Sequence, residues 1–326
     1  LIIIISPAKT ENLKNCEWYN KDGTPCIIIS KTSNTSIYSS QGINKITITK
    51  KDIDKSGAKD MTDVLKLISG LSVFQDGPTG QKTSVFTRGS ESNHTLVLLN
   101  GIAINDQSVT DGLHDFGQNF IQTIQQIEIY KGPNGAHFGP SAIAGAVNLI
   151  TDIDYNNSVT VDGYDKKNNS VSTNYVKITD NDWHLNFKAT TTQSQTNSAK
   201  AAGTEDDGTK NYQANVDVKK WINDNLKFKS TIYSRKTKSD YDVSTTKETG
   251  YVVDNKMYAI QTNLERISKN IGDELTFHYH NYERDYEDGG NLDEYESESL
   301  VAKAERKIKY TDRISFGFGS EYKYDW

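Results

Sequence analysis

Apolar and polar residues alternate with a period of two through the second half of the chain, from about residue 154 to residue 326. In residues 183–190, for example, Trp183, Leu185 and Phe187 are separated by polar side chains. Successive side chains of a β-strand point to opposite faces of the sheet, so the pattern predicts strands with one apolar and one polar face. This half of the chain is therefore constrained to an antiparallel sheet with two unlike faces.

The connections between the predicted strands alternate in length. Short turns are expected near residues 180–182, 223–225, 269–273 and 310–313, and long polar loops near residues 194–210, 237–255 and 285–299. Counting gives about nine strands after residue 157, each near or above the roughly 9–11 residues that cross a membrane when tilted. A soluble β-sandwich would also alternate, but short turns at one end and long loops at the other indicate an outer-membrane β-barrel.

Composition supports this interpretation. The 326 residues carry a net charge of −6 and a mean hydropathy of −0.67. The longest aliphatic run, residues 1–5, is far shorter than the roughly 18 apolar residues of a transmembrane helix, so any membrane crossing must use strands. The acidic balance argues against nucleic acid as a partner.

The N-terminal region divides into two segments. Residues 1–8 combine an aliphatic run with small residues, which predicts the remnant of a secretory signal peptide; a short buried strand is the alternative. Residues 9–39 are predicted to be a flexible linker. Its two cysteines, Cys16 and Cys26, fit no metal or redox motif, and the sequence leaves open whether they form a disulfide.

Residues 40–153 are predicted to form a compact domain with short helices and strands. Residues 61–68 have helical spacing before Gly70, residues 96–99 form an apolar run typical of a buried strand, and Asn100-Gly101 suits a tight turn. The glycine-rich residues 131–139 lack the ending of a phosphate-binding loop. We find no nucleophile–base arrangement or metal-ligand spacing, and expect no enzymatic activity.

Several motifs in this domain carry a family resemblance. They are Ser84-Val85-Phe86-Thr87-Arg88-Gly89, Thr95-Leu96-Val97-Leu98-Leu99-Asn100-Gly101, residues 127–133 and residues 145–151. Together they resemble the plug domain of TonB-dependent outer-membrane receptors. The resemblance implies an α+β plug domain (residues 40–153) followed by part of an antiparallel transmembrane β-barrel (residues 154–326). About nine strands of an expected 22 would be present, since plugged barrels have about 22 strands.

Within this family the likeness is strongest to the cobalamin receptors. It rests on residues 51–54, 63–65, 86–89, 204–208, 240–242 and 253–256. The resemblance implies TonB-dependent active uptake of cobalamin or a related corrinoid across the bacterial outer membrane, with the plug facing the periplasm. TonB with its inner-membrane complex, the corrinoid and outer-membrane lipid would be the partners. The alternatives are a ferric-siderophore or haem receptor of the same architecture, or a non-transporting outer-membrane binding protein.

The resemblance also implies three sets of site residues. A TonB box would be Cys26, Ile27, Ile28, Ile29 and Ser30, whose short aliphatic run could pair with another protein's sheet edge. Substrate would contact Asp76, Gly77, Thr79, Gln81, Asn105, Asp106, Gln107, Ser108 and Asp111. Two neighbouring loops would hold Ca²⁺ through Glu205, Asp207, Asp242, Asp254 and the backbone of Tyr241. The alternatives are a plain linker segment, ordinary polar turns and solvated acidic loops, respectively.

Overall fold

The structure, a computed structural model, describes residues 44–326 apart from short segments. Those segments are residues 78, 110–111, 134–137, 139–140, 152–154, 164–166, 198–205, 242–250, 289 and 312–314. The predicted signal remnant, the linker with its TonB box at residues 26–30, and Asp111, Glu205 and Asp242 lie outside the described residues. In the described part of the chain, no helix is both long and apolar enough to cross a membrane.

The first part of the described chain, residues 44–151, is an α+β domain that we call the plug. A five-stranded sheet has the order β1-β6-β7-β4-β5, and β2 pairs with β3 in a separate hairpin. The elements are β1 (Asn44–Thr49), α1 (Lys50–Ser56), α2 (Met61–Lys66), β2 (Leu71–Gln75), β3 (Thr83–Thr87), η1 (Ser92–His94), β4 (Thr95–Leu99), β5 (Ile102–Ala103), η3 (Phe116–Gln118), η4 (Ile121–Thr123), β6 (Gln126–Lys131) and β7 (Gly145–Ile150).

Local sequence explains how the plug helices begin and end. Thr49 and Asp52 form a capping box at α1, and Gly57 ends the helix with a φ of 71°. Asp60 caps α2 by accepting a hydrogen bond from the Asp63 backbone N–H at 2.9 Å. The helix predicted for residues 61–68 ends at Lys66, and Met61, Val64 and Leu65 in it are buried.

Strand β4 is buried along its whole length and pairs in parallel with β7 and antiparallel with β5. Asn100 and Gly101 follow it with φ values of 51° and 89°, the left-handed conformations that a type I′ turn needs. The buried strand and the turn predicted at residues 96–101 are thus confirmed.

The second part of the described chain is a nine-stranded antiparallel sheet in which each strand pairs with its neighbours in sequence. This confirms the predicted fold class and the predicted strand number. The strands are β8 (Ser158–Gly163), β9 (Asn169–Ile178), β10 (His184–Asn197), β11 (Asp206–Asn223), β12 (Leu226–Asp240), β13 (Tyr251–Ile267), β14 (Ile271–Asp288), β15 (Asn291–Lys309) and β16 (Ser315–Asp325).

The buried inner face of this sheet is polar and its exposed outer face is apolar, the reverse of the arrangement in a soluble β-sandwich. On β11 every second residue from Asp207 to Lys219 is buried and polar, whereas Tyr212 and Val216 on the other face are 52% and 36% exposed. Ile232 on β12 and Phe277 on β14 are likewise 50% and 60% exposed. An apolar outer face and a polar inner face are expected of a sheet whose outer face meets lipid.

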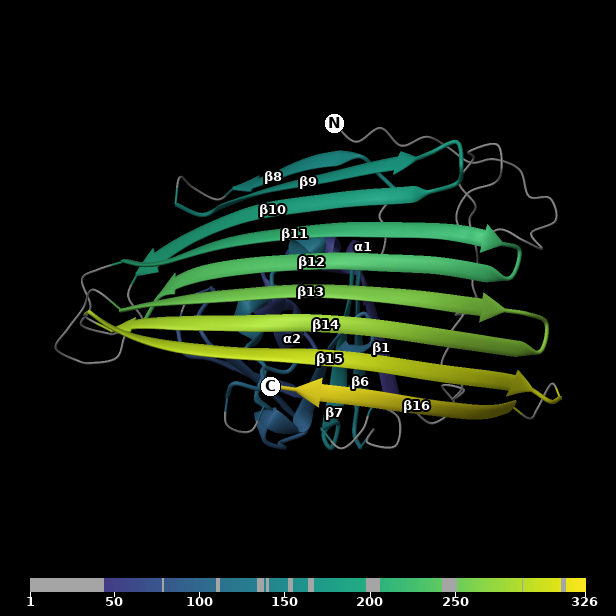
Figure 1. Ribbon diagram of the computed structural model, residues 1–326. Helices are drawn as coiled ribbons and strands as arrows, with labels where there is room; N and C mark the ends of the chain where they lie inside the picture. The colour runs from purple at the N-terminus through teal and green to yellow at the C-terminus, as the bar shows by residue number, and fades with distance from the viewer. Residues whose placement is uncertain are drawn as a thin grey trace. The chain divides into compact units, whose positions relative to one another are not determined.

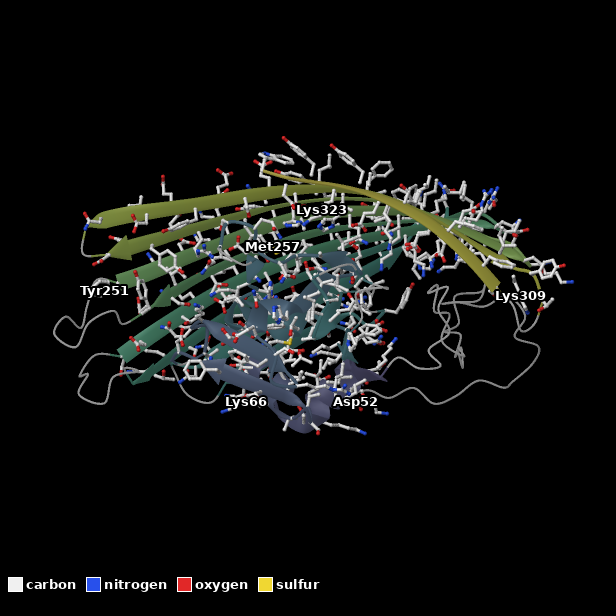
Figure 2. All side chains as sticks on the ribbon, turned by 90° about the horizontal axis from the view of Figure 1, so that it is seen from below. Asp52, Lys66, Tyr251, Met257, Lys309 and Lys323 are labelled. Carbon is white, nitrogen blue, oxygen red and sulfur yellow. The ribbon has the colours of Figure 1, made fainter. Side chains whose placement is uncertain are left out.

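The plug packs against the polar inner face. Figure 1 shows the plug elements behind the strands, and Figure 2 shows Asp52 and Lys66 on the side of the plug away from the sheet. Its hydrophobic core includes four side chains of the sheet: Tyr233, Met257, Ala259 and Tyr282. The plug is therefore anchored to β12, β13 and β14.

One predicted loop is wrong. Residues 285–299 were expected to form a long polar loop, but β14 continues to Asp288 and β15 begins at Asn291, which pairs directly with Asp288. Gly290, with a φ of 107°, lies in the tight connection. The segment is polar on both faces, so composition suggested a loop although its backbone pairs along the ladder. Strands β10 to β13 also extend into the other two predicted loops.

Candidate functional site

Two plug loops contact the inner face of the sheet at the same end of its strands. Residues 79–81 lie near the start of β11 and the end of β12, and residues 104–108 lie near the last part of β14. The two longest connections of the sheet, β10–β11 and β12–β13, are at this end. Both loops contain residues that the sequence predicted to contact substrate.

The first loop is held by its backbone. Thr209 of β11 donates to the Thr79 carbonyl at 2.7 Å, and Ser239 of β12 donates to the Gly80 carbonyl at 3.2 Å. Gln81 donates through its side-chain amide to the Asp240 carbonyl. Gly80 has a φ of +90°, and a Cβ there would lie 2.3 Å from the Thr209 side chain, so only glycine fits this contact.

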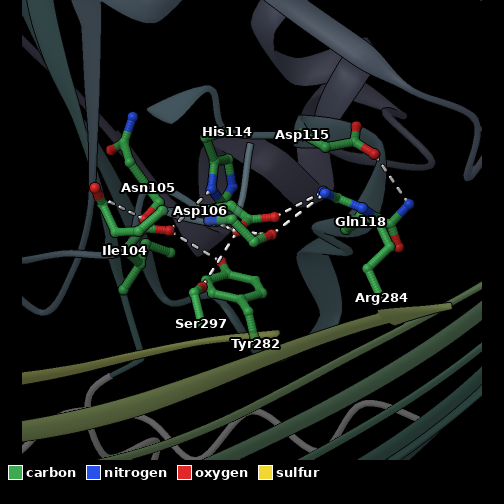
Figure 3. Close-up of polar contacts among 11 residues, drawn as sticks. Ile104, Asn105, Asp106, His114, Asp115, Gln118, Tyr282, Arg284 and Ser297 are labelled. Atoms are coloured by element: carbon green, nitrogen blue, oxygen red, sulfur yellow. Dashed lines mark hydrogen bonds and ion pairs between the residues drawn. The ribbon is translucent and has the colours of Figure 1, made fainter. Parts of the chain in front are cut away.

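The second loop is held by an ion pair (Figure 3). Arg284 of β14 contacts Asp106 at 2.7 Å, and the two side chains are only 13% and 10% exposed. Ser297 of β15 donates to Asp106 at 3.3 Å, and Tyr282 donates its hydroxyl to the Ile104 carbonyl at 3.0 Å. The loop is therefore fixed to two adjacent strands by charged and neutral hydrogen bonds.

Hydrogen bonds within the plug domain also fix loop 104–108. Asn105 accepts a hydrogen bond from the Val97 N–H at 2.8 Å and donates to the Gly112 carbonyl at 2.9 Å. His114 is buried, with ring nitrogens 3.3 Å from the Ile104 carbonyl and 2.6 Å from Asn119 Oδ1. Burial, aided by the positive charge of Arg235, lowers the pKa of His114 to about 4, so this histidine is neutral at pH 7.

Arg284 also belongs to an aromatic cluster at the same end of the strands, which we call the tyrosine cluster. Its guanidinium carbon lies 5.6 Å from the Tyr286 ring centre and 5.2 Å from that of Tyr295. Tyr241 packs at 5.7 Å against both Tyr251 and Tyr286. Two phenol rings against the arginine and two more packed beside them can bind an aromatic or hydrogen-bonding ligand by stacking and through their hydroxyl groups.

The predicted substrate residues have different positions. Asp106 and Ser108 lie against Arg284, and Thr79 and Gln81 lie against β11 and β12. Asp76 and Gln107 are exposed, Gly77 is partly exposed, and Asn105 is buried inside the loop. Sequence analysis missed the residues of the sheet that receive these loops. The sequence feature that could have revealed them is the period of two, because Tyr282, Arg284 and Tyr286 occupy alternate positions of one strand and so share a face.

Two of the described residues predicted to bind calcium, Asp207 and Asp254, lie on opposite faces of the sheet. Asp207 is buried on β11, whereas Asp254 on β13 is ion-paired with Lys236 at 3.0 Å. The Tyr241 N–H donates to the Tyr251 carbonyl at 3.1 Å. Within the described ranges, no group of three or more histidine, cysteine, aspartate or glutamate side chains is arranged to hold a metal ion. Because Glu205 and Asp242 lie outside these ranges, the calcium site stays a prediction.

Comparison with known proteins agrees with this architecture. Residues 36–146 match the family described as TonB-dependent Receptor Plug Domain. The siderophore receptor PirA from Acinetobacter baumannii is similar with a TM-score of 0.71 and 19% identity, covering 88% of this chain and 48% of that one. The ferric citrate transporter FecA in its unliganded form has a TM-score of 0.69 and 15% identity, covering 86% and 47%.

The ferric yersiniabactin uptake receptor FyuA from Yersinia pestis is also similar, with a TM-score of 0.62, 14% identity, and coverage of 87% of this chain and 56% of that one. At these identities the likeness establishes the fold, which is a plug domain followed by part of an antiparallel β-barrel. The chain spans about half the length of the solved structures that it matches.

Proposed function

We propose that the chain is part of a TonB-dependent outer-membrane receptor that imports an iron-loaded siderophore or a similar anionic iron chelate. The plug match at residues 36–146 supports the receptor class. The observation that carries the proposal is the convergence of plug loop 104–108, Arg284 and the tyrosine cluster at one end of the strands. A ligand bound there would touch the wall and the plug at once.

The tyrosine cluster and the similar structures together favour an iron chelate over a corrinoid. Arg284 is already ion-paired with Asp106, and the tyrosine cluster beside it supplies hydroxyl groups and aromatic faces that can bind chelating groups. Carboxylate, catecholate and related chelating groups are recognised by such side chains. The similar structures named above are receptors for a siderophore, ferric citrate and ferric yersiniabactin. Cobalamin, the ligand implied by the sequence motifs, is the alternative.

The remaining parts of the proposal concern location and energy. The apolar outer face of the sheet would contact outer-membrane lipid, and the plug would face the periplasm. TonB would pair with residues 26–30 by β-strand addition, which depends on an accessible backbone more than on particular side chains. The protein would move its ligand without making or breaking a covalent bond.

Direct binding measurements on the complete receptor in detergent test this function. Ferric citrate, a ferric catecholate siderophore, cobalamin and haemin are compared by titration. We expect an iron chelate to bind, and Tyr286→Ala to weaken that binding at least tenfold. Tyr258→Ala is the matched control, because Tyr258 is 46% exposed on the outer face of β13, and this variant should bind as the unmodified receptor does. Binding of cobalamin alone would restore the corrinoid assignment.

A further inference from the structure

Arg235 is a fully buried arginine at the contact between the plug and the sheet. It lies on the inner face of β12, its side chain is 2% exposed, and it is the largest fully buried side chain among the described residues. It faces Gln213 on β11 and Met257 on β13 in the strand register. Its guanidinium carbon lies 5.8 Å from the ring centre of Tyr282, the residue that binds the Ile104 carbonyl.

The charge of Arg235 has no direct counter-ion. An arginine side chain stays protonated in proteins, so burial cannot neutralise it as it would a lysine or histidine. Among the described residues, no carboxylate forms an ion pair with it. Asp115 of the plug is within reach of its electric field, but the Asp115 oxygens accept from Thr83 N–H at 2.8 Å, Gly117 N–H at 2.9 Å and Gln118 Nε2 at 3.1 Å.

Several hydrogen-bond donors around this charge also lack partners. Arg235 Nε and Nη1 are buried and have no acceptor among the described residues. The amide nitrogen of Gln213, on the residue directly opposite, is buried and unpaired in the same way. Buried donors are almost always satisfied in native proteins, and each exception calls for an explanation such as an ordered water or a bound ion. Three donor nitrogens without an acceptor call for a species that accepts hydrogen bonds.

We propose that Arg235 and Gln213 bind a resident small inorganic anion, chloride in the cell, between the plug and β11–β12. A water molecule could accept the same hydrogen bonds, but it would leave the buried positive charge uncompensated. An anion both accepts these hydrogen bonds and balances the positive charge of Arg235. Because its ligands lie beside Tyr282 and Thr123, which contact plug and sheet respectively, bound chloride would strengthen the seating of the plug.

Crystals of the complete receptor grown in bromide instead of chloride, without transport ligand, test the site directly. Bromide gives an anomalous signal that water does not. We expect a bromide peak at hydrogen-bond distance from Arg235 Nε or Nη1, and its loss in Arg235→Gln. Lys236→Gln is the matched control because it removes a positive charge from the next residue of the same strand, on the outer face, and should keep the peak. Ordered Arg235 with water alone, or a peak that persists in Arg235→Gln, would overturn the proposal.

Thermal unfolding gives a second readout that does not depend on crystals. The Tm of the receptor is compared in chloride, bromide and gluconate at equal ionic strength. Chloride and bromide should raise the Tm over gluconate for the unmodified receptor and Lys236→Gln, but not for Arg235→Gln. If Arg235→Gln does not fold, Gln213→Ala replaces it and should raise the half-maximal halide concentration several-fold. Equal Tm values in all three salts for the unmodified receptor would exclude a resident halide.

Discussion

The ion pair between Arg284 and Asp106 is expected to control how firmly plug loop 104–108 is seated. Removing one partner of a buried ion pair costs about 3–5 kcal/mol, because the other charge is left in a poorly solvated site. In Arg284→Gln, Asp106 would keep its hydrogen bonds from Ser108 N–H at 2.8 Å, Ser108 Oγ at 2.7 Å and Ser297 at 3.3 Å. The lower end, about 3 kcal/mol, is therefore appropriate, and it corresponds to roughly 100-fold in the opening equilibrium.

Amide hydrogen exchange of residues 104–109 in the complete receptor measures this opening. Arg284→Gln should accelerate their exchange by roughly 100-fold, and the double variant Asp106→Asn/Arg284→Gln by less, since no lone charge remains. Arg306→Gln, which breaks the more exposed pair with Asp273 on the same sheet, is the control and should change little. The reasoning is refuted if Arg284→Gln matches Arg306→Gln, or if the separate effects of Arg284→Gln and Asp106→Asn simply add in the double variant.

Further predictions concern other parts of the molecule. The pKa of His114 is about 4 in the folded protein and 6.5 in the unfolded chain, so that as the pH falls His114 is protonated in the unfolded chain before it is protonated in the folded protein. Stability from this residue should be complete above pH 6.5 and fall by about 3 kcal/mol as the pH drops to 4, as measured by denaturant unfolding at several pH values, and His114→Asn should flatten that dependence. Gly80→Ala, which combines a left-handed φ with a clash against Thr209, should destabilise loop docking by about 2–4 kcal/mol, visible as faster exchange of residues 79–83. If the predicted calcium site exists, a chelator should weaken ligand binding to the complete receptor and Asp254→Ala should remove this calcium dependence; equal affinities with and without chelator would argue against the site. Ile28→Pro should abolish uptake while leaving ligand binding intact, because proline removes a backbone donor needed for strand addition; undiminished uptake would discount residues 26–30 as the TonB box.

The sheet could be predicted from sequence because one physical rule governs each of its strands. Alternation of Leu185 and Phe187 with polar neighbours fixes which side chains share a face, and this rule needs no knowledge of distant residues. The prediction of the plug strand at residues 96–99 also needed only local sequence, because a continuous apolar run followed by Asn100-Gly101 specifies a buried strand and its turn.

The site could be predicted only in part. Asp106 was identified in the plug, but its partner Arg284 is 178 residues away, and their contact depends on how the plug sits against β14. Polar composition misled the prediction at residues 285–299, since strands that are polar on both faces resemble loops in composition. Such strands hold Tyr295 of the tyrosine cluster, so the error in the fold also hid part of the site.

The polar inner face of the sheet determines how the plug can come away from it. Where the two surfaces meet through hydroxyl, amide and carbonyl groups, as at Thr209 with Thr79 and Gln261 with Asn100, water can replace each partner as it leaves. Each such bond contributes a net of about 0.5–1.5 kcal/mol. The plug can therefore separate from the sheet in steps, breaking one hydrogen bond at a time. A steady mechanical pull on the plug would then meet a series of small barriers, and larger ones at Arg284 and at the apolar contacts of the plug core with Met257 and its neighbours on the sheet.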